Sequence, residues 1–451
     1  MAAIRSAQLG QKTALVERDR IGGTCLNTGC IPTKTLVRNA EIIHGAKNSA
    51  YRGIHIKEIT IDIQQTIAMK NQVVGQLRQG VEGLLAANGV TVFAAAAAVL
   101  DESKIQLEKN GSIEVIGYKN LIIATGSRPA PIPIPGAEEY AVTSTEMLDL
   151  TQIPKRVIII GGGVIGCEFA HVLQAFGSQV TILEAMPRII SSADEELSLA
   201  LEQSMKNAGI IVKTGCVVQK ITKVGEEKAV LVRMNDQEAS FIGDEVMLSI
   251  GRIPNTDGVA GLNLEMSGAY INVDECTRTS LPHIYAIGDV TGIRPLAHVA
   301  SHMGKAAAEN IAGMNSKYDD TIVPGCIFTS PEMAFVGLTE AEARKQYKDV
   351  KVGRFPLMAN GKALAMGETE GMFKVISDGS TGKLVGIHLL GVHAAEIIGE
   401  AAAFLKMGAT VDDIEKTIHA HPTIAEALQE AALDAAGRCI HMPPKGNQSM
   451  L

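Results

Sequence analysis

Two cysteines near the start of the chain are close enough in sequence to act together. Cys25 and Cys30 are separated by four residues in the run GGTCLNTGCIPTK. Such a pair can bind a metal, form a structural disulfide or work as a redox disulfide. A structural zinc site needs four ligands, and no second cysteine or histidine pair with suitable spacing lies nearby in the sequence. Zinc is therefore disfavoured.

The other cysteines disfavour a structural disulfide. The chain has seven cysteines, which is an odd number, and most of them stand singly in apolar sequence. This distribution is typical of a cytoplasmic protein and not of a secreted protein held by a disulfide framework. Ile31-Pro32-Thr33 predicts the start of a helix, because proline is common in the first turn. Cys30 would then lie at a helix N-terminus, where the dipole favours thiolate over thiol. The pattern favours a redox disulfide.

A glycine-rich segment, KRVIIIGGGVIGCEFAHVLQAFGSQVTILEA, forms the second candidate site. Val157–Ile160 predicts a strand, an apolar helical pattern follows the glycines, and a second strand is expected to end at Glu184. The G-x-G-x-x-G pattern consists of Gly161, Gly163 and Gly166. Glu184 stands 23 residues after Gly161, close to the spacing of a dinucleotide-binding Rossmann unit. An acid there suits the free ribose hydroxyls of NAD.

A repeat relates this segment to the start of the chain. Residues 9–17 match residues 176–184 at an offset of 167, which makes Glu17 the counterpart of Glu184. The counterparts of the glycines would precede residue 1. We therefore expect the sequence to begin inside the first helix of another nucleotide-binding domain. LIIATGSRP (121–129) and VMLSIGRIP (246–254) echo each other as well. Two related domains suggest two dinucleotides, a flavin and a nicotinamide.

The length and composition indicate an α/β protein of several domains. The chain has 451 residues, too many for one core, and its net charge of −8 argues against nucleic acid or an anionic membrane as a partner. No apolar run is long enough for a membrane helix, and the N-terminus lacks a secretory signal. After Asp320, strand-like runs such as GMFKVI and KLVGIHLL alternate with helical ones such as HAAEIIGEAAAFLKMG. This region is expected to form a separate α+β domain.

The run GGTCLNTGCIPTK resembles the active-site segment of the class I pyridine nucleotide–disulfide oxidoreductases. HAHPTIAE (419–426) and the NAD segment that ends in Glu184 resemble the dihydrolipoamide dehydrogenase branch, which serves 2-oxoacid dehydrogenase and glycine cleavage complexes. The match runs in the same order along essentially the whole chain. It departs at the start, where the family's first strand and FAD glycine loop are missing.

The resemblance implies two Rossmann-like dinucleotide-binding domains and a C-terminal α+β dimerisation domain. The boundaries expected are 1–145 for the FAD domain, 146–256 for the NAD domain, 257–322 for a segment completing the FAD domain, and 323–451 for the dimerisation domain. It also implies a homodimer.

The resemblance further assigns catalytic roles. Cys25 would be the thiol that meets dihydrolipoamide, and Cys30 the thiolate that lies against the flavin. His421 would be the general base, oriented by Glu426 and contributed by the other subunit. A histidine beside a carboxylate is an apt partner for thiol exchange, although His421 and Glu426 alone would not establish this role. His419 is expected to support the backbone.

The cofactors implied are FAD and NAD, with no metal. From spacing alone, Asp289 in YAIGDV could equally stabilise a turn or bind a ribityl hydroxyl. Lys34 would lie near the flavin and pair with Glu168, and Ala95 replaces a glycine found in many relatives. The residues implied on the FAD side are Glu17, Lys34, Ala95, Thr125, Gly126, Ser127, Asp289, Leu296, Ala297 and His298. Those implied on the NAD side are Gly161, Gly163, Gly166, Glu168, Glu184, Val218 and Gly251.

Two alternatives stay open at this stage. The chain could be another disulfide reductase of the class, although a glutathione-type enzyme would want basic residues where Glu184 stands, and Arg188 is close by. It could also be a flavin-free scaffold relative, because the first glycine loop is missing. In the preferred interpretation, dihydrolipoamide comes from a separate lipoyl-carrying protein of one of the complexes above, since no N-terminal lipoyl domain precedes the match.

Overall fold

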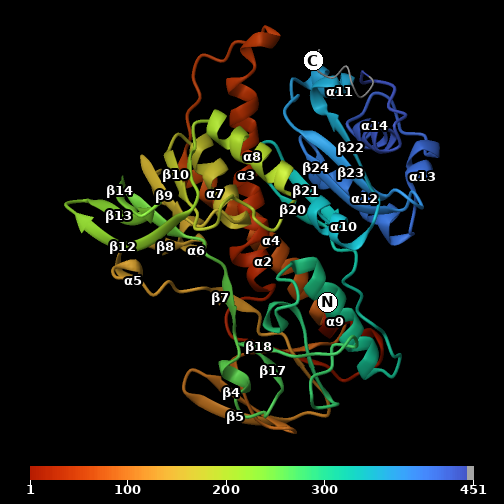
Figure 1. The fold of residues 1–451 in the computed structure, drawn as a ribbon. Helices are drawn as coiled ribbons and strands as arrows, with labels where there is room; N and C mark the ends of the chain where they lie inside the picture. The colour runs from red at the N-terminus through yellow and green to blue at the C-terminus, as the bar shows by residue number, and fades with distance from the viewer. Residues whose placement is uncertain (444–451) are drawn as a thin grey trace. The chain divides into compact units, whose positions relative to one another are not determined.

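The structure is a computed structural model that describes residues 1–443, and its contacts group the chain into two units (Figure 1). Unit 1 contains Met1–Thr35, Asp62–Pro131 and Gly251–Asp320. Unit 2 contains Leu36–Ile61, Ile132–Ile250 and, among the described residues, 321–443. The four predicted domain ranges stay predictions.

Unit 1 begins with the half that the repeat predicted. Helix α1 (Ala2–Gln8) leads into strand β1 (Ala14–Glu17), which pairs in parallel with β2 (Thr91–Ala94). The corresponding helix of unit 2, α7 (Val164–Ala175), ends 167 positions after α1, which is the offset of the sequence match. The predicted helix-to-strand correspondence is therefore confirmed.

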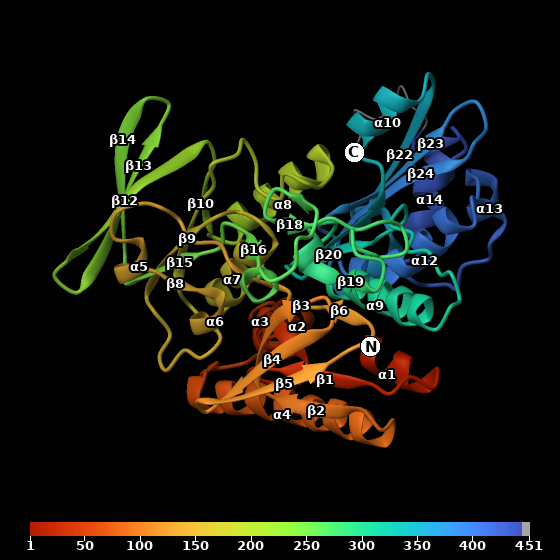
Figure 2. The ribbon, with the colours of Figure 1, turned by 90° about the horizontal axis from the view of Figure 1, so that it is seen from below.

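Two long helices accompany α1 in unit 1. Helix α1 packs against α9 (Ala297–Ile311) and α4 (Ile63–Ala87), as Figure 2 shows. Strand β19 (Ile284–Ala286) pairs in parallel with β6 (Leu121–Ile123). The remaining elements of this unit, besides the start of α3, are short: α2 (Gly23–Thr28), β3 (Ala96–Asp101), β4 (Lys104–Lys109), β5 (Ser112–Gly117), β7 (Ser127–Pro129), β16 (Arg252–Pro254), η2 (Asp257–Val259), β17 (Met266–Ser267), β18 (Tyr270–Ile271) and η3 (Gly288–Thr291).

The first part of unit 2 is a parallel sheet around the predicted strand. Strand β9 (Arg156–Ile160) lies between β10 (Gln179–Leu183) and β15 (Glu245–Leu248), and β11 (Ile211–Lys213) and β8 (Val142–Thr143) form the edges. Every residue of β9 after its first is buried and β-branched, which suits a strand covered on both faces. The predicted strand is confirmed.

Helices and a hairpin sheet complete this part. Helix α7 follows the glycine-rich turn, and α8 (Glu195–Asn207) precedes β11. The expected end of the second strand is one residue off, because β10 stops at Leu183 and Glu184 follows it. The other elements are α5 (Ala137–Tyr140), α6 (Ser144–Met147), β12 (Cys216–Val224), β13 (Glu227–Met234) and β14 (Gln237–Gly243), and unit 2 also holds most of α3 (Cys30–Lys47) with η1 (Ala50–Arg52).

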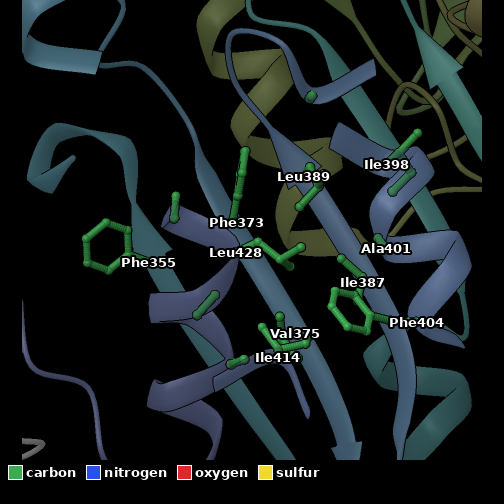
Figure 3. Packing of buried hydrophobic residues seen from close by; sticks show 14 of the residues in the cluster. Phe355, Phe373, Val375, Ile387, Leu389, Ile398, Ala401, Phe404, Ile414 and Leu428 are labelled. Atoms are coloured by element: carbon green, nitrogen blue, oxygen red, sulfur yellow. The ribbon is translucent and has the colours of Figure 1, made fainter. Parts of the chain in front are cut away.

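The second part of unit 2 is an antiparallel sheet of order β20-β21-β24-β23-β22. Apolar side chains of the sheet meet those of the helices that cover it, including Phe373, Val375, Phe404 and Leu428 (Figure 3). The predicted strands and helix of this region are confirmed, so it has the expected α+β character. Its elements are β20 (Gly325–Ile327), β21 (Met333–Gly337), α10 (Glu340–Gln346), β22 (Val350–Pro356), η4 (Leu357–Ala359), α11 (Gly361–Met366), β23 (Met372–Asp378), β24 (Leu384–Leu390), α12 (Ala394–Lys406), α13 (Val411–Lys416) and α14 (Glu426–Ala435).

The two echoed segments contribute corresponding strands. Residues 121–129 supply β6 and β7, and residues 246–254 lie in β15 and β16. Strands β7 and β16 pair with each other in antiparallel register, with Ser127 opposite Pro254. Across residues 1–443, no helix combines the length and apolar character needed to cross a membrane.

Candidate functional site

The two cysteines lie at a break between two helices. Cys25 is in α2, and Cys30 is the first residue of α3, as the predicted helix start requires. Gly29 separates the helices, and a Cβ built on it would lie 2.9 Å from Thr24 O and 3.2 Å from the Cα of Cys25. The absence of a side chain at Gly29 therefore lets the chain fold back and brings Cys30 to Cys25.

Short-range hydrogen bonds hold this break. The side-chain amide of Asn27 donates to Ile21 O and Gly23 O at 3.0 Å each. Gly29 O accepts bonds from the backbone N of Thr33 at 3.1 Å and from its hydroxyl at 2.7 Å. The segment 21–33 is thus shaped largely by its own residues.

The cysteine side chains interact directly in this structure. A hydrogen bond with the Cys30 side chain, together with burial, raises the pKa of the Cys25 thiol well above its ordinary value. The charge of Lys34, one turn into α3, opposes this shift. The contact with Cys30 and burial thus keep the proton on Cys25.

The glycine-rich turn between β9 and α7 allows close approach of backbones. Gly161 has a φ of +109°, and a Cβ on it would lie 2.5 Å from Ser249 O. A Cβ on Gly166 would lie 2.1 Å from Gly161 O. Gly163 is the N-cap of α7, and a Cβ built on it would have no neighbouring atom within 4 Å. These are the properties of a phosphate-binding turn at a helix N-terminus.

Glu184 sits against this turn from the end of β10. Its carboxylate accepts hydrogen bonds from Gly162 N at 2.6 Å and from Met186 N at 2.7 Å. The nearby Arg188 donates to Ser191 O at 3.0 Å and to Ala193 O at 3.4 Å. The arrangement fits a dinucleotide whose ribose hydroxyls meet an acid, so these residues fit NAD.

The other residues predicted for NAD are placed as follows. Glu168 is buried in α7 and accepts a bond from Phe328 N at 3.1 Å, and Val218 lies in β12. Gly251, with a φ of +112°, belongs to unit 1, whereas the rest of this set belongs to unit 2. Lys34 and Glu168 likewise fall in different units. Their pairing stays a prediction.

Unit 1 gathers polar groups where β7 and η3 begin. The hydroxyl of Ser127 donates to Asp289 at 2.5 Å, and that of Thr125 donates to Asn255 O at 2.6 Å. Arg252 donates to the hydroxyl and the carbonyl of Ser127 at 2.7 Å each. Sequence analysis missed Arg252 and Asn255, although Arg252 is the arginine of the echoed run VMLSIGRIP. Asp289, the turn residue with two equal interpretations, is thus bonded to one of the predicted cofactor residues.

The remaining residues predicted for FAD also lie in unit 1. Glu17 ends β1, and its carboxylate accepts a bond from Asp19 N at 2.9 Å. The backbone N of Ala95 donates to Glu17 O at 3.0 Å, so those two residues are adjacent. Gly126 has a φ of +69°. Leu296 is the N-cap of α9, which begins with Ala297 and His298. An acid at a strand end, a hydroxyl–carboxylate cluster and a helix start are chemically suited to FAD.

Two neighbouring histidines of unit 2 have opposite surroundings. His419 is 4% exposed, and its ring nitrogens contact Thr417 O and Glu400, both at 3.0 Å. The hydrogen bond that the His419 ring donates to the Glu400 carboxylate raises the pKa of His419. The structural role of His419 stays a prediction. Glu400 was not found from the sequence.

His421 is 79% exposed, and its Nδ1 lies 2.8 Å from Glu426. Burial opposes the charged form of Glu426, but hydrogen bonds from Thr423 N and His421 outweigh it and lower the pKa of the carboxyl. The predicted pair is thus in contact, with the other face of the imidazole toward solvent. Because His421 and the cysteines are in different units, their meeting stays a prediction.

The remaining cysteines have surroundings unlike those of the pair. Cys167, Cys216 and Cys276 are buried, and burial raises the pKa of Cys167 and Cys216. Cys439 donates to Glu430 at 3.0 Å, and burial with this bond raises its pKa to about 12. Within the described residues, no group of three or more His, Cys, Asp or Glu side chains could hold a metal ion.

Comparisons with known proteins agree with this geometry. Residues 1–304 match the family described as pyridine nucleotide-disulphide oxidoreductase, and residues 323–432 match its dimerisation domain. The chain is 40% identical to a dihydrolipoyl dehydrogenase of Bacillus subtilis (strain 168), covering 98% of this chain and 96% of that one. Similar enzymes of Chlamydia pneumoniae and Geobacillus stearothermophilus are 39% and 38% identical, each over 99% of this chain and 96% and 95% of their own length.

Proposed function

Since the chain belongs to the pyridine nucleotide-disulphide oxidoreductase family, we propose that it is a dihydrolipoyl dehydrogenase, which oxidises dihydrolipoamide to lipoamide and reduces NAD⁺ to NADH. The observation that carries the proposal is the contact between the Cys25 and Cys30 side chains at the start of α3. Near full-length similarity to dihydrolipoyl dehydrogenases of several bacteria supports the choice of substrate.

The thiol chemistry begins with Cys25 and Cys30 joined as a disulfide. One sulfur of dihydrolipoamide attacks the sulfur of Cys25 and releases Cys30 as a thiolate, which its place at the N-terminus of α3 favours. The second substrate sulfur then attacks the first substrate sulfur, which is bonded to Cys25 in the mixed disulfide, and releases Cys25. Lipoamide leaves, and both cysteines have gained the two electrons that the substrate lost.

His421 removes the proton of the attacking substrate thiol. Glu426 holds the imidazole through Nδ1, so the Nε2 side can face the substrate. In the proposed homodimer, each site combines the cysteines of one protomer with His421 and Glu426 of its partner. The match of residues 323–432 to a dimerisation domain supports a dimer of this kind.

FAD and NAD are the cofactors we assign. When bound, they supply the acceptor for the two electrons of the reduced cysteines and the hydride carrier. On the FAD side, Ser127 and Asp289 supply hydroxyl and carboxylate groups, and Glu17 supplies an acid for a ribose. On the NAD side, the turn at Gly161 and Gly166 would receive the pyrophosphate. The chain's own part is to bind and orient both groups and to hold the reacting sulfurs.

The lipoyl group is expected on a separate protein of a 2-oxoacid dehydrogenase or glycine cleavage complex, and the site of action is expected to be the cytoplasm. Purified full-length enzyme should be assayed with dihydrolipoamide and with reduced glutathione, using NAD⁺ and NADP⁺ in turn. We expect dihydrolipoamide with NAD⁺ to be the fastest combination by at least about a hundredfold.

Cys439→Ser is the matched control, because a serine hydroxyl can still donate to Glu430. This variant should keep the activity of the natural chain. Faster turnover of glutathione, or a requirement for Cys439, would contradict the proposed function.

A further inference from the structure

A buried lysine joins the two parts of unit 2. Lys374 lies in β23, and its side chain is 2% exposed. Its Nζ lies 2.8 Å from Asp194, 2.8 Å from Glu196 and 2.9 Å from Glu340. Asp194 and Glu196 belong to the start of α8 in the nucleotide-binding part, whereas Glu340 opens α10. One cation therefore connects three carboxylates from two structural parts.

The position of Lys374 on β23 explains its direction. Side chains of a strand alternate between its two faces. Phe373 and Val375 point into the apolar cluster under the helices (Figure 3). Lys374 therefore points to the opposite face, where its Nζ contacts Asp194 and Glu196 at the start of α8. Arg354 adds a second cation to the charged cluster of Lys374, Asp194, Glu196 and Glu340. It lies 2.7 Å from Glu196 and 2.9 Å from Glu340.

A cluster of this kind is an expensive way to stabilise a fold. Removing charges from water costs as much as their attraction returns, and well-packed apolar side chains often serve as well. Burial opposes the charge on Lys374, but the hydrogen bonds to Asp194, Glu196 and Glu340 raise its pKa. The cluster is therefore fully charged at neutral pH, and a role in fixing geometry accounts for it better than stability does.

Asp194 is the point where the cluster acts on the nucleotide-binding part. It is the N-cap of α8, and its Oδ1 accepts bonds from Lys374 and from Glu196 N, the latter at 3.2 Å. Its Oδ2 accepts a bond from Glu340 N at 3.1 Å. Both oxygens of the Asp194 carboxylate are thus held by residues of the second part of unit 2.

The loop before Asp194 touches the glycine-rich turn. Ile190 N donates to Gly162 O at 2.9 Å, and Ala193 N donates to Ile190 O at 2.9 Å. Ile189 is fully buried, and its Cγ2 would lie 2.8 Å from a Cβ at Gly162. The hydroxyl of Ser198, one turn into α8, donates to Ile189 O at 2.6 Å. The contacts therefore run without a break from α8 to Gly162.

We propose that Lys374 is a positioning residue for the dinucleotide site, acting through Asp194 and the loop at Ile189 and Ile190 on Gly162. Gly162 N in turn bonds Glu184, so the same contacts orient the acid that meets the ribose. In this proposal Lys374 acts through these residues rather than by touching the cofactor. The inference rests on the proposed function only in taking this turn as the NAD site.

The test is Lys374→Met in the full-length holoenzyme, measured by equilibrium titration with NADH. Methionine keeps the length of the side chain and removes the charge. We expect the dissociation constant for NADH and the KM for NAD⁺ to rise about tenfold. The rate at which dihydrolipoamide reduces the enzyme without NAD⁺ should stay unchanged.

Phe373→Leu is the matched control, because it weakens the same strand on the opposite face without touching the cluster. It should lower the melting temperature and leave NADH binding unchanged. Asp194→Asn is a second variant in case Lys374→Met fails to fold, and it should weaken NADH binding about threefold.

Unchanged NADH binding in Lys374→Met would overturn the inference, as would an equal loss in Phe373→Leu. If Lys374→Met does not fold, unchanged binding in Asp194→Asn decides against it. Failure of the natural chain itself to bind NADH would instead contradict the proposed function.

Discussion

The thiol segment (residues 21–34) and the dinucleotide segment (residues 156–198) are shaped in different ways. In the thiol segment, Gly29 packs on Cys25, and Asn27 bonds carbonyls a few residues away. In the dinucleotide segment, Gly161 packs closely against Ser249. Gly162 is connected by a series of contacts through Asp194 to Lys374, and both Ser249 and Lys374 are distant in sequence. The first site therefore depends on local sequence, and the second on tertiary contacts. Mutations should accordingly separate the two half-reactions.

The largest effect is expected from Cys30→Ser. A hydroxyl cannot form the disulfide, so dihydrolipoamide oxidation should fall at least about a thousandfold. NADH binding should be unchanged, because the dinucleotide segment shares no residue with the thiol segment. Steady-state assays and NADH titration measure the two properties. Substantial turnover in this variant would assign the redox role to other groups.

Gly166→Ala should produce the opposite separation. Its Cβ would lie 2.1 Å from Gly161 O, so the turn must move and NAD⁺ reduction should fall about a hundredfold. Reduction of the enzyme by dihydrolipoamide should persist in a single-turnover experiment. Gly80→Ala in α4 has open space at its Cβ and should behave as the natural chain. Equal losses in both half-reactions would mean that the two segments are coupled.

Glu184→Arg should sharpen the role of the acid beside the glycine turn. Removing the carboxylate and adding a cation should shift the NAD⁺ to NADP⁺ preference by about tenfold or more, read as the ratio of kcat/KM values. Glu184→Gln is the control that removes only the charge. An unchanged preference would show that another residue reads the ribose, with Arg188, which bonds Ser191 O and Ala193 O, as the candidate.

The smallest effect is expected from lowering the pH, which should reduce the melting temperature through the charged cluster around Lys374. Burial opposes the ionised forms of Asp194, Glu196 and Glu340, but hydrogen bonds from Lys374 lower the pKa values of all three carboxyls. Arg354 adds a hydrogen bond to Glu196 and one to Glu340. A carboxyl whose pKa is lowered in the folded state stabilises the fold at pH values above its ordinary pKa. This stabilisation is lost as the pH falls through the lowered pKa. Between pH 5 and pH 3, the natural chain should therefore lose about 3 °C more in melting temperature than Lys374→Met. Parallel melting curves of the two proteins would contradict this.

Sequence predicted best where neighbouring residues carry the information. The strand before Gly161, the helix that starts at Cys30 and the repeat ending at Glu17 all follow from patterns within one element and its turn. Strand β23 was also expected from the run GMFKVI. These parts depend on burial periodicity and turn chemistry, which short stretches of sequence record.

The missed features depend on residues distant in sequence. In the sequence, Lys374 is an ordinary polar residue of a strand. Its neighbours do not indicate that it will be buried and paired with Asp194. The bond between His419 and Glu400 and the packing of Ser249 on Gly161 are similarly invisible. Arg252 left a signal in the echoed run, but its bonds to Ser127 require the pairing of β7 with β16. Such contacts exist only after the chain has folded.

The central claim is that Cys25 and Cys30 open and close as a disulfide during turnover. Full-length enzyme should be quenched in acid before and after one equivalent of dihydrolipoamide, then denatured, alkylated and analysed by peptide mass spectrometry. We predict that Cys25 and Cys30 are protected before reduction and alkylated after it, while the other five cysteines are alkylated in both samples. Equal alkylation of the pair in both samples would contradict the account.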